Sequence, residues 1–295
     1  LTFKHKTFAA GAGEFPASEI ETRAILDFLY DAFNVYAVVS FSSLNNLSTS
    51  DDKVTTVVSD LYNKTMGVKD APKPSAEGGD FLSWAYQHYG RFSFSTQGWW
   101  VPKAKPDTAK KEKAFTVEDA TANYLRWSAQ QGLNHFTEWK TIQHPDFPGQ
   151  VVQVGGVDPY VMMNPPYNMV DSIAIKHTAF LTKLVNLKPQ VVVQKVDTQK
   201  LSNGLTKITI DVANTGMLPT HSKFADRNYF VKRLKVALQL TDKQQLIGGQ
   251  KLALINNMEP HSMQQFSWIV KGTGTVTVET GSPAIGLTTK AISLQ

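Results

Sequence analysis

The sequence predicts a mixed α/β chain made of an α/β domain followed by an all-β domain. Helix-like and strand-like segments alternate over residues 18–96, an order typical of an α/β layer fold. After Pro189 the pattern changes to short β-rich runs separated by turns, as in an Ig-like all-β sandwich of roughly 100 residues. The length of 295 residues accommodates two domains, which we place at residues 1–188 and 189–295.

The first predicted elements are a helix and a strand. Ser18 and Glu21 have the spacing of a capping box, so a helix is expected from Ser18 through Tyr30. Residues 35–42 form a continuous, β-branched apolar run. Such a run is typical of a buried strand in a parallel sheet that is covered on both faces.

The alternation continues with helices at about 51–66 and 81–88 and a strand at 91–96. The stretch 101–166 is rich in turns and is interpreted as an insertion carrying one helical hairpin or less. Thr116 and Asp119 form the expected capping box of its helix.

Asp171 to Leu187 is predicted to form a long amphipathic helix. Its expected inward-facing residues are Ile173, Ile175, Phe180, Leu181, Leu184 and Val185. The expected strands of the all-β domain are 190–197, 205–214, 229–240, 264–271 and 274–280. Asn203-Gly204 is a strong signal for a hairpin between the first two of them.

Composition limits the function classes. The chain is 42% hydrophobic and 19% charged, with a net charge of +5, so no nucleic-acid partner is expected. The basic run at 103–113 is interpreted as a solvated loop. The absence of cysteine excludes disulfides and cysteine ligands. No apolar run reaches the ~18 residues of a membrane span, so no transmembrane segment is expected.

A Gly-Gly pair at 78–79, a helix containing Trp84 and Tyr86, and a Phe-x-Phe strand lead to residue 97. This segment resembles the last active-site segment of the M14 family of zinc carboxypeptidases. Residues 13–24 resemble the family's Ser-Glu-x-Glu-Thr segment, and residues 214–220 and 268–274 are similar to bacterial members with an appended β-domain. The resemblance implies the C-terminal portion of a mixed-sheet carboxypeptidase-like α/β/α domain, followed by the sandwich.

The resemblance also implies that three functional positions are changed. Ser42 stands where the family has its third zinc-binding His, and a neutral hydroxyl is a poor zinc ligand. Gln97 stands where the family has its catalytic Glu, and an amide cannot act as a general base. Pro74 falls near the position of the family's substrate-covering Tyr.

In the family, the His-x-x-Glu zinc ligands and an Asn-Arg pair lie before the segment that matches residues 13–24. The chain opens at Leu1, at or just after that point. We therefore expect a preceding part in the full-length protein, carrying any targeting signal.

Three hypotheses follow. The first is a catalytically inactive protein without a cofactor, acting as a binding or structural subunit among envelope proteins or peptides. Its bacterial location would be periplasmic, outer-membrane-associated or extracellular. The second is an active zinc metallocarboxypeptidase that releases C-terminal residues, in which Glu77, Glu138 or His135 replaces a lost group. The third, an enzyme with different chemistry on the same scaffold, has no residue pattern that names a reaction.

Aromatic residues gather in or beside the insertion. Trp99, Trp100, Trp127 and Trp139 form a candidate binding surface, because tryptophan is enriched in interaction hot spots. The favoured alternative is a small satellite core that anchors the insertion. His88 and His177 fall within expected helices and are interpreted as packed or surface histidines.

Overall fold

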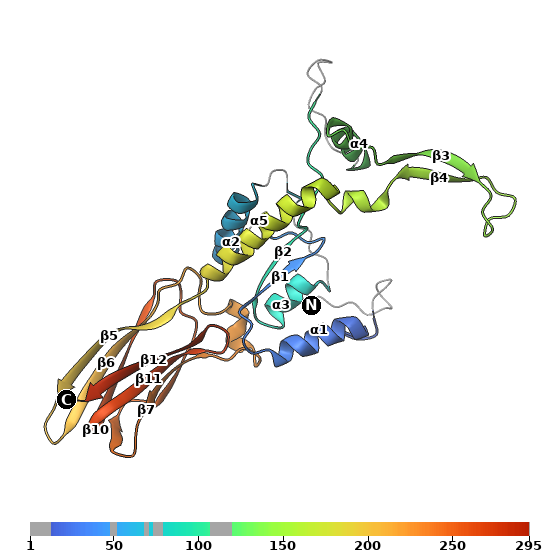
Figure 1. The fold of residues 1–295 in the computed structure, drawn as a ribbon. Coiled ribbons are helices and arrows are strands. Elements are labelled where there is room, and N and C mark those ends of the chain that lie inside the picture. Colours follow the sequence, from blue (N-terminus) through green and yellow to red (C-terminus); the bar gives the residue numbers. More distant parts are fainter. Residues whose placement is uncertain (1–12, 48–51, 68–70, 73–78, 107–119, 295) are drawn as a thin grey trace.

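The computed structural model describes residues 13–47, 52–67, 71–72, 79–106 and 120–294. The chain is mixed α/β, as predicted: helices and short strands precede residue 187, and antiparallel strands follow residue 190 (Figure 1). The first part contains α1 (Ile20–Asp31), β1 (Ala37–Phe41), α2 (Lys53–Met66), α3 (Phe81–Gln87), β2 (Phe92–Thr96), α4 (Ala120–Gln130), β3 (Phe136–Ile142), β4 (Val152–Val157) and α5 (Tyr167–Asn186).

β1 and β2 form a parallel two-stranded sheet, with Ala37 opposite Phe92 and Phe41 opposite Thr96. The expected parallel pairing is therefore confirmed. α2 and α5 lie on one side of the sheet, and α3 and α1 lie on the other (Figure 1). β2 is buried along its length, whereas β1 is only partly buried, so the full burial expected for the strand at 35–42 is wrong. The core under α2 and α5 contains Val58, Tyr62, Met66, Phe92, Phe94, Phe180 and Leu184.

Two of the three first helices begin at an aspartate. The carboxylate of Asp52 accepts hydrogen bonds from the first-turn amides of α2, and Asp80 does the same for α3. The capping box expected at Ser18 is wrong, because α1 begins after Glu19 and has no side-chain cap. Ala17 adopts a positive φ of 58° and Ser18 Oγ donates to Glu19 Oε1 at 3.1 Å, so the turn leaves Ser18 outside the helix.

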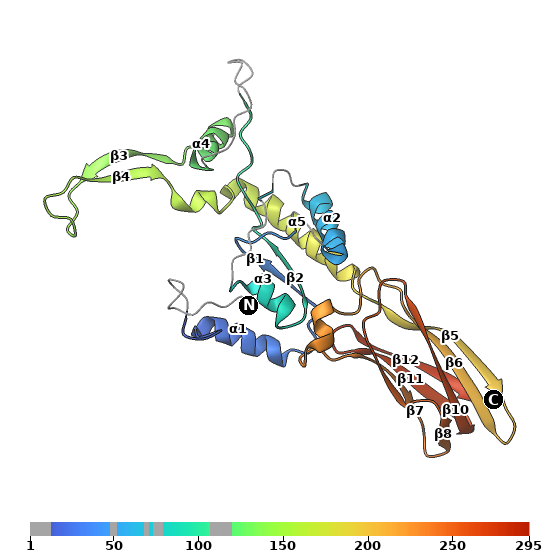
Figure 2. The ribbon, with the colours of Figure 1, turned by 180° about the vertical axis from the view of Figure 1, so that it is seen from behind.

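The stretch 101–166 contains more structure than predicted. Besides α4 it holds an antiparallel hairpin of β3 and β4, which projects from the rest of the molecule in both views (Figures 1 and 2). The hairpin was missed because Gly155 and Gly156 interrupt the apolar alternation. A Cβ atom on Gly155 would lie 2.7 Å from Trp139 Cα, so the strands approach closely only with glycine there. Thr116 and Asp119 lie outside the described residues.

α5 is longer than predicted and is buried on a narrower face. Phe180 and Leu184 pack into the core, but Ile175 is 69% exposed and Val185 is 62% exposed. Leu181 is also exposed, at 36%, so the inward orientation expected for Ile175, Leu181 and Val185 is wrong. The physical reason is that the described sheet has only two strands, so it covers a narrow strip of a 20-residue helix.

The second part is a β-sandwich of two four-stranded sheets, ordered β5-β6-β10-β8 and β12-β11-β7-β9. Buried side chains from both sheets, including Ile208, Ile210, Trp268, Val236, Leu238 and Val278, form its core. The strands are β5 (Val191–Lys200), β6 (Leu205–Asn214), β7 (Leu234–Gln239), β8 (Gln244–Gly248), β9 (Leu252–Ile255), β10 (Met263–Gly272), β11 (Gly274–Ser282) and β12 (Gly286–Leu294).

The predicted β-sandwich is confirmed, but the prediction missed some of its strands. β8, β9 and β12 were not predicted, and the strand expected at 229–240 begins only at Leu234. The hairpin predicted at Asn203-Gly204 is confirmed, since both residues have positive φ angles, 63° and 70°.

The long connection between β6 and β7 joins the sandwich to the helical part. Ser222 Oγ donates to the Gly90 carbonyl at 2.9 Å, and Asn228 Nδ2 donates to the His88 carbonyl. A Cβ on Gly90 would lie 2.9 Å from Asn228 Nδ2, so this close approach requires glycine. The two parts therefore meet through specific backbone contacts.

Candidate functional site

The two predicted active-site positions, Ser42 and Gln97, lie at the same edge of the parallel sheet. Ser42 directly follows β1 and Gln97 directly follows β2. Phe41 is opposite Thr96, so both chains leave the sheet side by side. Ligands of open α/β sheets bind at the carboxyl ends of the strands, which makes this edge the first place to look for chemistry.

Both side chains make hydrogen bonds within the protein. Ser42 Oγ lies 2.8 Å from Ser95 Oγ and accepts a hydrogen bond from the Leu44 amide at 3.2 Å. Gln97 Nε2 donates to the Ser43 carbonyl at 2.9 Å. Neither side chain ionises, so this pair can orient and hydrogen-bond a ligand but cannot take up its proton.

Asn46 closes the outer edge of β2 at this end of the sheet, and the sequence interpretation missed it. Its Nδ2 donates to the Ser93 carbonyl at 3.0 Å, and its Oδ1 accepts from the Ser95 amide at 2.7 Å. The side-chain amide thus replaces a neighbouring strand. An asparagine shortly after a predicted strand was the available signal, but its partners are 47 and 49 residues away.

His177 of α5 contacts the residue that follows Gln97. Its Nε2 lies 2.8 Å from the Gly98 carbonyl. A carbonyl only accepts, so Nε2 carries the hydrogen. The imidazole packs edge-on against Phe41, at 5.0 Å between ring centroids, and Nδ1 is buried without a partner among the described residues. His177 is therefore packed and fixes the backbone after Gln97.

A second buried contact lies beneath the strand ends. Tyr62 Oη and Thr96 Oγ1 are 2.8 Å apart, and the Gly98 amide donates to the same Thr96 oxygen at 3.1 Å. Burial raises the pKa of the Tyr62 phenol. The hydrogen bond with Thr96 lowers this pKa, but by less, so the pKa stays above its usual value. The phenol is therefore a neutral structural group at physiological pH.

The described residues contain no group of three His, Asp or Glu side chains that could hold a metal ion. His135 lies in the insertion, where its Nδ1 contacts the Tyr124 hydroxyl. Glu138 is on the projecting β3. Pro74 and Glu77 lie outside the described residues. Neither His135 nor Glu138 is brought to the strand ends that carry Ser42 and Gln97.

The four tryptophans are not gathered in one cluster. Trp99 and Trp127 pack edge-on, with ring centroids 6.1 Å apart, in a small core around α4. Trp100 instead packs against the core beneath α2 and α5. Trp139 lies on the hairpin and is 57% exposed. Two of them thus anchor the insertion, and Trp139 alone presents most of its surface to solvent.

The family comparison locates its match in the sandwich. The model of a domain of unknown function, DUF8731, matches residues 190–293. No curated protein matches.

Among solved structures, the chain is similar at 14% identity to DesR, a β-glucosidase from Streptomyces venezuelae. It is similar at 12% identity to a GH3 β-glucosidase from Bifidobacterium adolescentis. Both similarities have a TM-score of 0.20 and span 36% of this chain, with 15% and 17% of the respective enzymes covered. They support no inference about activity.

Proposed function

We propose that this chain is a binding or structural protein on a zinc-carboxypeptidase-like scaffold that has lost its catalytic groups. The observation that carries the proposal is that Ser42 and Gln97 lie at the adjacent carboxyl ends of β1 and β2. Those are the positions where the sequence resemblance expects a zinc-binding histidine and a general base. Both side chains are bonded to neighbouring residues instead.

The chemical consequence is large. In a metallopeptidase the metal polarises the scissile carbonyl and activates water. The general base alone contributes about 10²–10⁴ in rate. A serine hydroxyl bonded to Ser95 and a glutamine amide bonded to Ser43 supply neither function.

The binding role is supported by the exposed apolar side chains of the hairpin and the segment after it. Trp139 is 57% exposed, Val151 83%, Val154 46% and Tyr160 70%. Exposed apolar side chains are a common feature of protein or peptide interaction sites. We propose other envelope proteins or peptides as partners, in the bacterial location expected from the resemblance. No described helix is long and apolar enough to cross a membrane.

The test uses the full-length protein, dialysed against a weak chelator. Zinc is measured by mass spectrometry, and release of C-terminal residues from a peptide mixture is followed with and without added zinc. We expect far less than one zinc per chain and no release. About one zinc per chain with chelator-sensitive release would establish the alternative, an active zinc metallocarboxypeptidase.

Gln97→Glu is the matched variant. On the proposed scaffold no bound metal activates a water for this carboxylate to deprotonate, so we expect no gain in the rate of peptide release. A gain of about 10²–10⁴ in rate would show that only the general base was missing and that a metal site is intact.

A further inference from the structure

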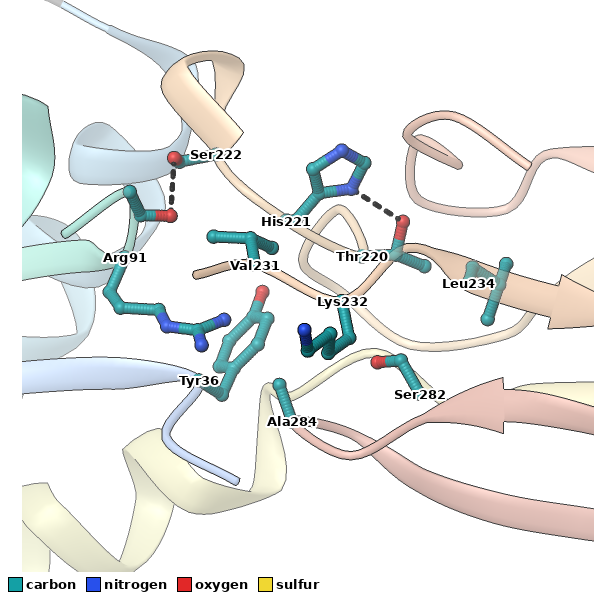
Figure 3. A pocket seen from close by; sticks show the side chains of 11 residues that line it. Tyr36, Arg91, Thr220, His221, Ser222, Val231, Lys232, Leu234, Ser282 and Ala284 are labelled. Atoms are coloured by element: carbon teal, nitrogen blue, oxygen red, sulfur yellow. Dashed lines mark hydrogen bonds between the residues drawn. The ribbon is translucent and has the colours of Figure 1, made fainter. Parts of the chain in front are cut away.

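A small, partly open cavity lies between the helical part and the sandwich (Figure 3). Its lining includes Tyr36 and Arg91 from the first part and His221, Ser222 and Lys232 from the β6–β7 connection. The space open to the centre of a water-sized sphere is about 10 Å³. That is room for one particle of about the size of a water molecule.

Arg91 brings a buried positive charge to this cavity. The residue is 3% exposed, and its guanidinium extends toward Tyr36 (Figure 3). One terminal nitrogen donates to the Phe230 carbonyl at 3.0 Å, and the guanidinium carbon lies 5.0 Å from the Tyr89 ring centroid. Its Nε–H has no acceptor among the described residues. Both assigned contacts are with neutral groups, so neither supplies a negative charge.

The other lining groups add positive charge and no negative charge. Lys232 Nζ lies 4.6 Å from the Phe33 ring and 4.9 Å from the Tyr229 ring, and the residue also lines the cavity. No aspartate or glutamate is among the lining residues. Asp226 does not line the cavity, but its Oδ1 lies 2.8 Å from Nε2 of the lining residue His221.

Two neutral donors of the cavity lining already have acceptors within the protein. The Tyr36 hydroxyl donates to the Pro219 carbonyl at 2.6 Å, and Ser222 Oγ donates to the Gly90 carbonyl. Burial lowers the pKa of Arg91, but a guanidinium stays protonated in proteins. A buried cation without a counter-charge is costly, and an anion beside it removes most of that cost.

We propose that this cavity binds a small monovalent anion of halide size, held by Arg91 Nε–H and the charge of Lys232. The cavity volume sets the size limit: a halide ion is a single sphere somewhat larger than a water molecule, whereas an organic anion such as gluconate has many more atoms and is too large. The anion would contact residues of both parts, so its binding would stabilise their docking.

The first test is crystallographic. Crystals of the protein soaked in sodium bromide are measured at the bromine absorption edge. We expect an anomalous peak within hydrogen-bonding reach of Arg91 Nε. Well-ordered crystals with a water and no bromide in the cavity would overturn the proposal.

The second test measures melting temperature at constant ionic strength in sodium bromide or sodium gluconate. With bromide about tenfold above its Kd, we expect melting to rise by about 3–5 °C over gluconate. Arg91→Met should abolish this difference and Lys232→Met should reduce it. Arg233→Met, which removes an exposed charge from the same segment, should leave it unchanged.

Lys232 is exposed, so Lys232→Met keeps the test valid if Arg91→Met does not fold. A bromide effect that is the same in Lys232→Met and Arg233→Met as in the unmodified protein would be general salt stabilisation and would overturn the proposal.

Discussion

Truncation of the Asn214 side chain should lower the free energy of unfolding of the sandwich strongly. It ends β6, is completely buried, and bonds to five backbone groups. Its Oδ1 accepts from the amides of Gln190 and Gly216 at 3.2 and 3.1 Å. Its Nδ2 donates to the carbonyls of Leu218, Met258 and Glu259 at 2.9, 3.2 and 3.3 Å. It therefore ties together three separate segments.

The expected cost of Asn214→Ala follows from those bonds. Each intramolecular hydrogen bond contributes about 0.5–1.5 kcal/mol net, and a buried group left unpaired costs about 1–3 kcal/mol. Two Nδ2 hydrogens are shared among three carbonyls, so about four effective bonds are lost, and we expect a loss of about 3–5 kcal/mol. That is a large fraction of the roughly 5–15 kcal/mol that stabilises a domain.

The assay is urea unfolding followed by circular dichroism, with Asn256→Ala as the matched control. Asn256 is exposed and close in sequence to the Met258 and Glu259 partners, so its truncation should cost less than about 0.5 kcal/mol. Asn214→Asp keeps an acceptor but places a carboxylate oxygen against carbonyls, which raises its folded-state pKa. Its relative stability should therefore be best below about pH 4 and fall as the pH rises toward 8.

A loss of less than about 1 kcal/mol in Asn214→Ala, similar to that of Asn256→Ala, would refute the reasoning. It would mean that water or a backbone shift satisfies the five groups without the side chain. Equal stability of Asn214→Asp at pH 4 and pH 8 would contradict the assigned orientation of the amide.

Three further predictions rest on burial, backbone angle and pH. Phe180→Ala should cost about 3–5 kcal/mol in urea unfolding, whereas Ile175→Ala on the same helix, 69% exposed, should cost far less; equal losses would contradict the observed packing of α5. Gly98→Ala, at φ 75° and with a phenylalanine ring 3.1 Å from the new Cβ, should cost more than Gly132→Ala, at φ 70° with no neighbour within 4 Å; thermal melting should separate the two. Burial raises the pKa of Tyr36 far above its usual value. The folded state therefore keeps a proton that the unfolded state loses above about pH 10, and stability should fall by up to about 1.4 kcal/mol per pH unit from this group. Tyr36→Phe should be less sensitive to alkaline pH in urea unfolding between pH 9 and 11, and an unchanged slope would refute the assignment.

The elements that could be predicted are those whose signals are local. Asp52 and Asp80 cap the helices that directly follow them, and Asn203-Gly204 adopts the left-handed angles that its hairpin needs. The β3–β4 hairpin lacked such a signal. Gly155 is explained only once the strands are paired, because a Cβ atom there would lie 2.7 Å from Trp139 Cα.

Burial was harder to predict than secondary structure, because it depends on what the rest of the chain supplies. Ile175 and Phe180 both fit an inward-facing pattern on α5, but only Phe180 meets the core under α2. The roles of Arg91 and Asn214 likewise depend on partners far along the chain, such as Phe230 at 139 residues and Met258 at 44. No short sequence window contains those contacts.

The candidate site likewise has one part that the sequence predicts and one part that depends on contacts far along the chain. That Ser42 and Gln97 come to one edge follows from two parallel strands in register. What their side chains do there depends on the loop after β1, whose Ser43 carbonyl accepts the Gln97 amide at 2.9 Å. An ionised glutamate could not donate this bond and would face the carbonyl with like partial charge. The observed backbone is therefore complementary to glutamine at this position.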